Sequence, residues 1–357
     1  MAKYFADLRL LVVTAALTLA ACGSPENGTA GAGNGAKSGE ERVLNLYSSR
    51  HYQTDEAFYA AFTEQTGIRI QRVEAKGDEL IERLSSEGLQ SPADVFVTVD
   101  AGRLWRAEQA GLFAPLASES LDEKIPAHLR HPDGLWYGYS TRARMIFYDK
   151  TRIDATGLND YESLADPRWK GEVCIRSSDN IYNLSLLASI IAHAGTEAAE
   201  AWAAGVVANM ARPPQGGDTD QLKAVAAGEC GIAVANSYYF ARMLASTDPA
   251  DKAAVEKLGW IFPNQNNRGS HINVSGAGMV RGAPHPEAAR KFLEYLATDD
   301  AQRWFAEGNN EYPVTDVTLD NPALEAMGPF KSDQLNVAEL GTHQAEAQRV
   351  FDRAGWR

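Results

Sequence analysis

The chain has 357 residues, about the length of two domains of ordinary size. Hydrophobic residues make up 45% of it and charged residues 23%, which is typical of a globular protein and excludes a polytopic membrane protein or a mostly disordered chain. The formal net charge of −13 argues against non-specific nucleic-acid binding, and three cysteines are too few for a disulfide-scaffold fold or a four-cysteine zinc site.

The first residues predict a secretory signal peptide. A positively charged start precedes the uncharged run 10–21, which is too short to span a bilayer. The run ends in the letters LAAC at 19–22, which resemble the lipobox of bacterial lipoproteins, where the peptide is cut before the cysteine and its thiol is lipidated. We therefore expect residues 1–21 to be a lipoprotein signal peptide and Cys22 to carry lipid; the alternative is an ordinary signal peptide with an incidental cysteine.

Residues 23–40 contain six glycines and no aromatic or large aliphatic residue, so this segment cannot form a hydrophobic core. With Cys22 it is expected to be a flexible tether, with a span of roughly 20–25 Å. The expected product is a folded body held near an extracytoplasmic membrane surface.

From residue 41 onwards, short β-rich runs alternate with helical runs, which is typical of an α/β fold with a largely parallel sheet. The expected strands are 43–47, 68–73, 94–99, 172–175, 231–235 and 273–280. The expected helices are 55–65, 78–86, 102–110, 181–193, 238–246, 285–298 and 299–307. No repeat of fixed period is visible.

The sequence carries no Gly-x-Ser-x-Gly elbow, Walker loop, His-Glu-x-x-His or Cys-x-x-Cys motif, so no common enzyme class is indicated. Cys174 and Cys230 each fall in or beside an expected strand of the same half of the chain. In an oxidising compartment a disulfide between them is favoured over two buried thiols.

Tyrosines follow three of the expected strands, each at a strand-to-helix junction. These junctions contain His51 and Tyr52, Tyr182, and Tyr238 with Tyr239. In open α/β sheets the ligand crevice lies outside the carboxyl ends of the strands, so the three junctions can converge on one cleft. A single tyrosine at such a place is more often a packing residue, but four tyrosines and a histidine at matching junctions favour a binding site.

The chemistry of several phenols together indicates a strongly charged cation. A phenol normally titrates near pH 10, and a metal that displaces its proton is held by phenolate oxygen. Fe3+ is a hard cation that prefers oxygen donors. Four phenolates around Fe3+ would give the site a net charge of −1. Arg142, Arg144 and Arg242 are the candidates to balance it. A sugar or amine site could also use tyrosines, but such sites usually add tryptophan platforms and carboxylates.

Six segments of the sequence resemble a known family. They are YSSRHYQTD, PADVFVTVDAGRLWRAEQAGLF, WYGYSTRAR, IRSSDNIYN, ARPPQGGDTDQLKAVAAGEC and NSYYFAR. These segments are similar to the ferric-iron-binding proteins of bacterial and cyanobacterial iron ABC importers, over nearly all of residues 43–315. The resemblance implies the type II periplasmic-binding-protein fold, in which two lobes, each a mixed, mainly parallel sheet flanked by helices, enclose a cleft that holds the metal.

The resemblance also implies domain boundaries. Lobe 1 would comprise residues 41–137 plus 271–357, and lobe 2 residues 138–270. The chain would cross between the lobes near 138–141 and near 271–274. The carboxy-terminal stretch 315–357 would pack on lobe 1.

The same resemblance implies a set of iron ligands. His51 and Tyr52 would come from lobe 1, and Tyr182, Tyr238 and Tyr239 from lobe 2. Arg142, Arg144 and Arg242 match arginines that lie behind the ligands in the family, and Arg142 is the strongest of the three candidates. With four tyrosines present, a synergistic carbonate is not required for charge.

The expected function is therefore that of the substrate-binding component of an Fe3+ importer. Such a protein would be a monomer in the periplasm or at the cell surface, anchored to the membrane through Cys22, and would deliver iron to an inner-membrane ABC permease without being an enzyme. The sequence leaves Fe2+ open as the oxidation state of the cargo. Two alternatives remain: a solute-binding protein for an oxyanion, polyamine or sugar, and a secreted enzyme with a tyrosine as acid or nucleophile.

Overall fold

The computed structural model describes residues 42–50 and 54–357. The signal peptide and tether expected at 1–40 lie outside the described residues, as do Cys22, His51 and Tyr52. The described chain falls within one compact unit, Glu41–Arg357.

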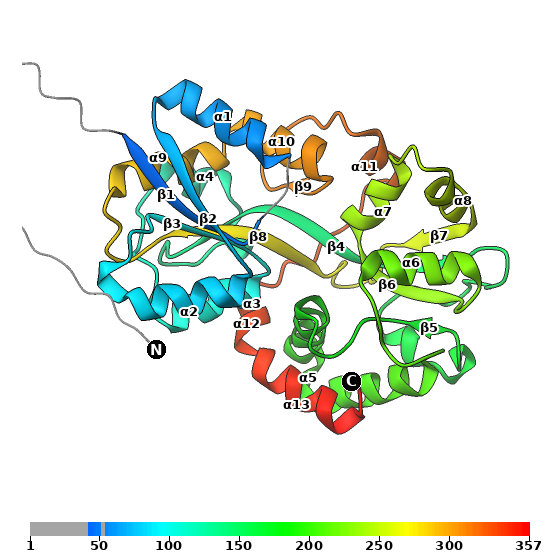
Figure 1. Ribbon diagram of the computed structural model, residues 1–357. Coiled ribbons are helices and arrows are strands. Elements are labelled where there is room, and N and C mark those ends of the chain that lie inside the picture. Colours follow the sequence, from blue (N-terminus) through cyan, green and yellow to red (C-terminus); the bar gives the residue numbers. More distant parts are fainter. Residues whose placement is uncertain (1–41, 51–53) are drawn as a thin grey trace, which may run out of the picture. The chain divides into compact units, whose positions relative to one another are not determined.

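A nine-stranded mixed sheet forms the centre of the described chain (Figure 1). Its strands are β1 (Val43–Ser48), β2 (Arg69–Glu74), β3 (Val95–Val99), β4 (Tyr137–Asp149), β5 (Val173–Cys174), β6 (Ile232–Asn236), β7 (Leu258–Ile261), β8 (Ile272–Met279) and β9 (Tyr312–Pro313). Their order is β2-β1-β3-β8-β4-β6-β5, and β7 and β9 also pair with β4. The pairs β1–β2, β1–β3 and β5–β6 are parallel, whereas every pair made by β4 or β8 is antiparallel.

The two long strands β4 and β8 join the two halves of this sheet. They pair with each other from Tyr137↔Ala277 to Ala143↔Ile272. On its other edge β8 pairs with β3 over Ser275–Met279, and beyond Ala143 β4 pairs with β6 and β7. The crossings expected at 138–141 and 271–274 lie inside the paired region, so both halves share one continuous sheet.

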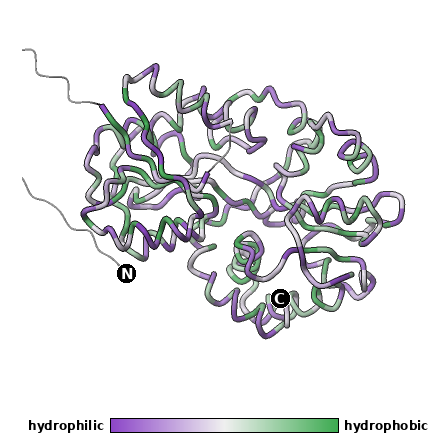
Figure 2. The backbone as a smooth tube through the Cα atoms, viewed as in Figure 1, coloured by the Kyte–Doolittle hydropathy of each residue, from purple (hydrophilic) through white to green (hydrophobic). Residues whose placement is uncertain are grey.

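Helices cover both faces of the sheet. They are α1 (Asp55–Thr66), α2 (Gly77–Glu87), α3 (Ala101–Gln109), α4 (Glu119–Lys124), α5 (Ile181–Asn209), α6 (Asp218–Ala227), α7 (Ser237–Leu244), α8 (Pro249–Lys257), α9 (Pro286–Leu296), α10 (Asp299–Asn309), α11 (Pro322–Met327), α12 (Ala338–Thr342) and α13 (Gln344–Ala354). Near β1–β3, α1 and α9 lie on one face and α2 and α3 on the other (Figure 1). These helices mix hydrophilic and hydrophobic residues, as expected for helices with one face on a core (Figure 2).

The mixed α/β architecture agrees with the fold class expected from the sequence. The expectation of a mainly parallel sheet is wrong, because five of the eight strand pairs in the described part of the chain are antiparallel. The longest strand was also missed. The sequence analysis proposed a crossing of the chain near 138–141 and no strand there, whereas β4 runs for 13 residues. Almost all of its residues are buried, including the charged Arg142 and Arg144, so hydrophobic and polar residues do not alternate along it. A strand buried on both faces lacks the period of two by which strands are usually recognised.

The carboxy-terminal end of the chain does not pack as the sequence suggested. Helix α13 packs against α5, which belongs to the segment 138–270, and the indole rings of Trp356 and Trp202 lie 5.9 Å apart. The expectation that residues 315–357 pack on lobe 1 is therefore wrong for this helix. Helix α5 has a kink at Gly195 (φ 83°), and its second half contacts the end of the chain through the rings of Trp202 and Trp356 and the ion pair of Glu200 with Arg353.

A disulfide joins Cys174 and Cys230, the pair considered in the sequence analysis. Cys174 ends β5, and Cys230 lies just before β6, the parallel neighbour of β5. The bridge spans a sequence separation of 56 residues, and closing a loop of this size stabilises a fold by about 2–4 kcal/mol. It therefore ties together the two strands that precede α5 and α7.

None of the helices in residues 42–50 and 54–357 combines the length and the apolar character needed to cross a bilayer.

Candidate metal centre

Three of the candidate tyrosines lie in the first turns of two helices. Tyr182 is the second residue of α5, and Tyr238 and Tyr239 are the second and third residues of α7. Helix α7 follows β6 directly, and α5 follows β5 after a short loop. Because β5 and β6 are parallel neighbours, both helices begin near the same carboxyl edge of the sheet, where the positive ends of helix dipoles favour anionic oxygens.

The structure brings these three tyrosines together. The hydroxyl of Tyr238 donates a hydrogen bond of 3.2 Å to the hydroxyl of Tyr182, from a position 56 residues away in the chain. The rings of Tyr238 and Tyr239 have centroids 4.2 Å apart and an interplanar angle of 32°. Three phenols from two junctions therefore form one cluster. The other two predicted ligands, His51 and Tyr52, lie outside the described residues.

The environment keeps Tyr182 protonated at neutral pH. Burial raises the pKa of Tyr182 to about 12, and the nearby phenol of Tyr239 adds to this effect. The positive charge of Arg142 and the hydrogen bond with Tyr238 act in the opposite direction on this pKa. The phenol can therefore become a phenolate near neutral pH only when a cation takes the place of its proton.

The buried guanidinium of Arg144 lies behind the tyrosine cluster, and its carbon is 5.9 Å from the ring centroid of Tyr182. It donates hydrogen bonds to Asp218 (2.9 Å), Asn236 (3.0 Å) and Asn183 (2.8 Å). Asp218 is fully buried and also accepts from the backbone N–H of Asn236 at 2.7 Å. Because Asn183 follows Tyr182 and Asn236 precedes α7, this network fixes the starts of both tyrosine-bearing helices.

The predicted arginines play different parts in the structure. Arg144 is neutralised by Asp218 and so does not add net charge near the phenols. The guanidinium carbon of Arg242 lies 5.8 Å from the ring centroids of both Tyr238 and Tyr239. Arg142 is buried on β4 and acts electrostatically on Tyr182. Arg142 and Arg242 are therefore the better candidates to balance bound phenolates.

The sequence analysis missed Asp218, Asn183, Asn236 and Arg176. The guanidinium carbon of Arg176 is 5.8 Å from the ring centroid of Tyr182, and its Nη1 is 3.6 Å from Asp218. All four lie within or beside the segments IRSSDNIYN, GGDTD and NSYYFAR. For Arg176, Asn183 and Asn236, the concentration of polar residues around the tyrosine junctions was the signal, whereas Asp218 lies at no such junction.

Among the described residues, no group of three or more His, Cys, Asp or Glu side chains is placed to hold a metal ion.

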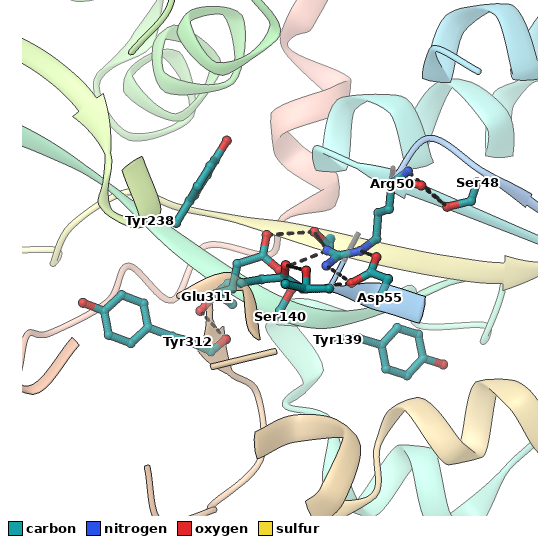
Figure 3. Close-up of polar contacts among 12 residues, drawn as sticks. Ser48, Arg50, Asp55, Tyr139, Ser140, Tyr238, Glu311 and Tyr312 are labelled. Atoms are coloured by element: carbon teal, nitrogen blue, oxygen red, sulfur yellow. Dashed lines mark hydrogen bonds and ion pairs between the residues drawn. The ribbon is translucent and has the colours of Figure 1, made fainter. Parts of the chain in front are cut away.

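A further polar network, around Arg50 and Glu311, lies in the same region as Tyr238 (Figure 3). Arg50 directly precedes the residues 51–53.

The chain is similar to known proteins over most of its length. A family model described as bacterial extracellular solute-binding protein matches residues 90–331. The iron uptake protein A2 of Synechocystis sp. is 53% identical over 322 residues, which cover 90% of this chain and 92% of that protein. The major ferric iron-binding protein of Neisseria meningitidis is 26% identical over 322 residues, which cover 88% and 93% of the two chains.

The chain is also similar to a protein of known structure. A Trichodesmium protein (IdiA, FutA), solved in complex with iron and citrate ligands, is 54% identical to this chain and superposes with a TM-score of 0.85. The match covers 88% of this chain and 100% of that chain.

Proposed function

Because this chain belongs to the family of bacterial extracellular solute-binding proteins, we propose that it is the iron-binding component of an Fe3+ ABC importer. The observation that carries the proposal is the 3.2 Å separation of the Tyr238 and Tyr182 hydroxyls, with Tyr239 beside them. Phenolates at this distance repel one another unless a cation of high charge lies between them, and Fe3+ prefers such oxygen donors. The relatives named for iron support the same cargo.

The ligand set in this proposal is His51, Tyr52, Tyr182, Tyr238 and Tyr239. Four phenolates outweigh the charge of Fe3+ by one negative charge, which Arg142 and Arg242 are placed to offset. A carbonate is then not needed for neutrality. With His51 as a ligand the site could also hold Fe2+, if one phenol stays neutral or an arginine shifts to adjust the charge.

The mechanism rests on ligands that come from separate parts of the chain. Lobe 2, residues 138–270, would supply Tyr182, Tyr238 and Tyr239. Lobe 1, residues 41–137 plus the chain from residue 271 up to α13, would supply His51 and Tyr52. Iron would then favour the closed arrangement of the lobes, in which all five ligands reach it. An inner-membrane ABC permease that separates the lobes would remove two ligands and so release the metal.

This role makes the protein a carrier and not an enzyme, acting in the periplasm or at the cell surface as a monomer. The periplasmic location is supported by relatives such as the Fe(3+)-binding periplasmic protein of Serratia marcescens.

The proposed function is tested by titrating the purified protein with ferric citrate at several pH values. We expect a visible phenolate-to-iron charge-transfer band, and a stabilisation of about 2.7 kcal/mol when free iron is a hundred times its Kd. Because the pKa of Tyr182 is raised to about 12 without metal, binding releases its proton, and affinity should rise with pH and fall as the pH drops below neutral.

Tyr182→Phe provides the matched control for the pH dependence. This variant should make the fall of log Kd with rising pH less steep by about one log unit per pH unit, because one phenol fewer is ionised on binding. A colourless wild-type protein with no thermal shift would contradict iron binding. A thermal shift produced instead by an oxyanion, polyamine or sugar would identify the alternative cargo.

We further propose that the mature protein is anchored through a lipid on Cys22. The Cys22→Ala variant should then lack an acyl chain and be either unprocessed or freely soluble, with unchanged iron affinity. Intact-mass measurement and detergent partition of the two proteins provide the test. Acylation that persists in the variant would contradict the lipobox interpretation.

A further inference from the structure

In the sequence, two of the proposed iron ligands, His51 and Tyr52, fall between Arg50 and Asp55, which form a buried ion pair. The Nε of Arg50 is 3.1 Å from Oδ2 of Asp55, and its Nη2 is 3.4 Å from Oδ1. The side chains are 3% and 4% exposed. Arg50 follows β1, and Asp55 is the first residue of α1, so the pair fixes the spacing of the two chain segments on either side of residues 51–54.

Glu311 connects this ion pair to the centre of the sheet. Arg50 Nη1 donates to Oε2 of Glu311 at 3.0 Å and to Oγ of Ser275 at 2.8 Å (Figure 3). Glu311 also accepts from Ser140 at 2.7 Å and from Ser275 at 3.3 Å. Ser140 on β4 and Ser275 on β8 are register partners in the region that joins the two halves of the sheet. Arg50 is therefore attached to both connecting strands.

The charge of Glu311 is maintained by the arginines around it. Burial would raise the pKa of Glu311, but the charges of Arg50 and then Arg142 hold this pKa below its ordinary value. The carboxylate is therefore ionised while only 1% exposed, and it is the ion-pair partner of Arg50, which directly precedes residues 51–53.

Stability alone is a weak explanation for this arrangement. Desolvating a carboxylate and a guanidinium costs about as much as their attraction returns, and well-packed apolar residues often stabilise such a site equally well. A hydrogen-bonded ion pair does, however, restrict the position and orientation of its members much more narrowly than apolar contacts do. The network is therefore suited to holding a chain segment in one place.

We propose that Glu311 is a positioning residue for the metal centre, which, through Arg50, holds the chain from which His51 and Tyr52 extend. This inference rests on the proposed iron-binding function. Glu311 itself does not touch the metal in this account. Groups that orient metal ligands typically contribute about 10- to 100-fold to metal affinity.

The test compares Glu311→Gln with the wild type in competition titrations of iron against citrate. Glutamine retains the size of the side chain and an acceptor for Ser140, but it removes the charge that holds Arg50. We expect iron affinity to fall by about 10- to 100-fold and the charge-transfer band to shift. If Glu311 acts by positioning the ligands at 51 and 52, adding Glu311→Gln to a His51→Ala, Tyr52→Phe variant should cause almost no further loss of iron affinity. In a Tyr182→Phe variant, Glu311→Gln should lower the iron affinity by the same factor as it does in the wild type.

Asp94→Asn is the matched control. Asp94, directly before β3, is a fully buried carboxylate that accepts from the backbone N–H groups of Asn45 (2.7 Å) and His285 (2.6 Å). Its loss should lower the melting temperature and leave the iron band and the iron affinity unchanged. If Glu311→Gln does not fold, Ser275→Ala, which removes one donor to Glu311, should show a smaller loss of affinity in the same direction.

The outcomes separate this inference from the proposed function. A folded Glu311→Gln variant with wild-type affinity and colour would overturn the inference alone, as would an equal loss of affinity in the His51→Ala, Tyr52→Phe background. Wild-type affinity in Ser275→Ala would decide against the inference where Glu311→Gln does not fold. A wild-type protein that binds no iron would overturn the proposed function, and the inference would fall with it.

Discussion

The double substitution Tyr238→Phe, Tyr239→Phe is expected to abolish both the colour and the tight binding of Fe3+. Each change keeps the aromatic ring and removes only the oxygen, so the 4.2 Å ring packing within the pair is retained. Two of the three phenols described in the cluster would be lost, and a hard cation would retain too few anionic oxygens. Absorption spectra and citrate competition provide the measurement, with the melting curve of the metal-free protein as a check on folding.

Tyr47→Phe and Tyr59→Phe are the controls for this prediction. Both residues are buried in the core outside the strand-to-helix junctions, and the hydroxyl of Tyr47 donates to Glu87 at 3.0 Å. These variants should keep the iron band and full affinity, although Tyr47→Phe loses a hydrogen bond. A Tyr238→Phe, Tyr239→Phe protein that still turns coloured and shows the full thermal shift would eliminate this site as the iron centre.

Replacing Asp218 by asparagine should destabilise the fold by about 3–5 kcal/mol. The carboxylate is fully buried and is the ionic partner of Arg144, whose guanidinium is 1% exposed. Removing one member of such a pair leaves the other charge desolvated and uncompensated, which costs much more than the net contribution of the pair itself. The free energy of unfolding from urea titration, without metal, would measure this effect.

Asp300→Asn provides the matched comparison for a pair at similar distance on the surface. Asp300 Oδ1 lies 2.6 Å from Arg303 Nη2, but the aspartate side chain is 85% exposed. Because water already solvates both charges, this variant should unfold almost as the wild type does. Equal free energies of unfolding for the Asp218→Asn protein and the wild type would contradict the prediction that breaking the buried pair destabilises the fold.

The sequence predicted those features of the fold that depend on local patterns. The alternation of short apolar runs with amphipathic segments located β1, β3, β6 and β8 to within about two residues, a normal accuracy for element boundaries. The repeated placement of tyrosines after strands identified Tyr182, Tyr238 and Tyr239, which meet in the structure. Both signals depend on neighbouring residues in the chain.

Features that depend on distant contacts were not predictable in this way. The apolar stripe of α13 shows that one face is buried but does not show that its partner is α5. Glu311 precedes a two-residue strand that ends in proline, and nothing near it indicates that it meets Arg50, 261 positions earlier. Similarly, Asp218 is an ordinary first-turn acid on α6, and its pairing with Arg144 follows only from the tertiary fold.

The network of Arg144, Asp218, Asn183 and Asn236 has a consequence for how iron would leave the protein. It holds the starts of α5 and α7 together, so in the proposed iron site the three phenol oxygens on these helices would act as a single rigid chelating group. In such a group, a phenolate that dissociates from the metal would stay close to it, at a very high effective concentration. It would therefore rebind before the other two phenolates could dissociate. Escape of the ion by successive loss of single bonds would therefore be slow. Fast transfer would require a competing chelator or a conformational change that acts on several donors at once.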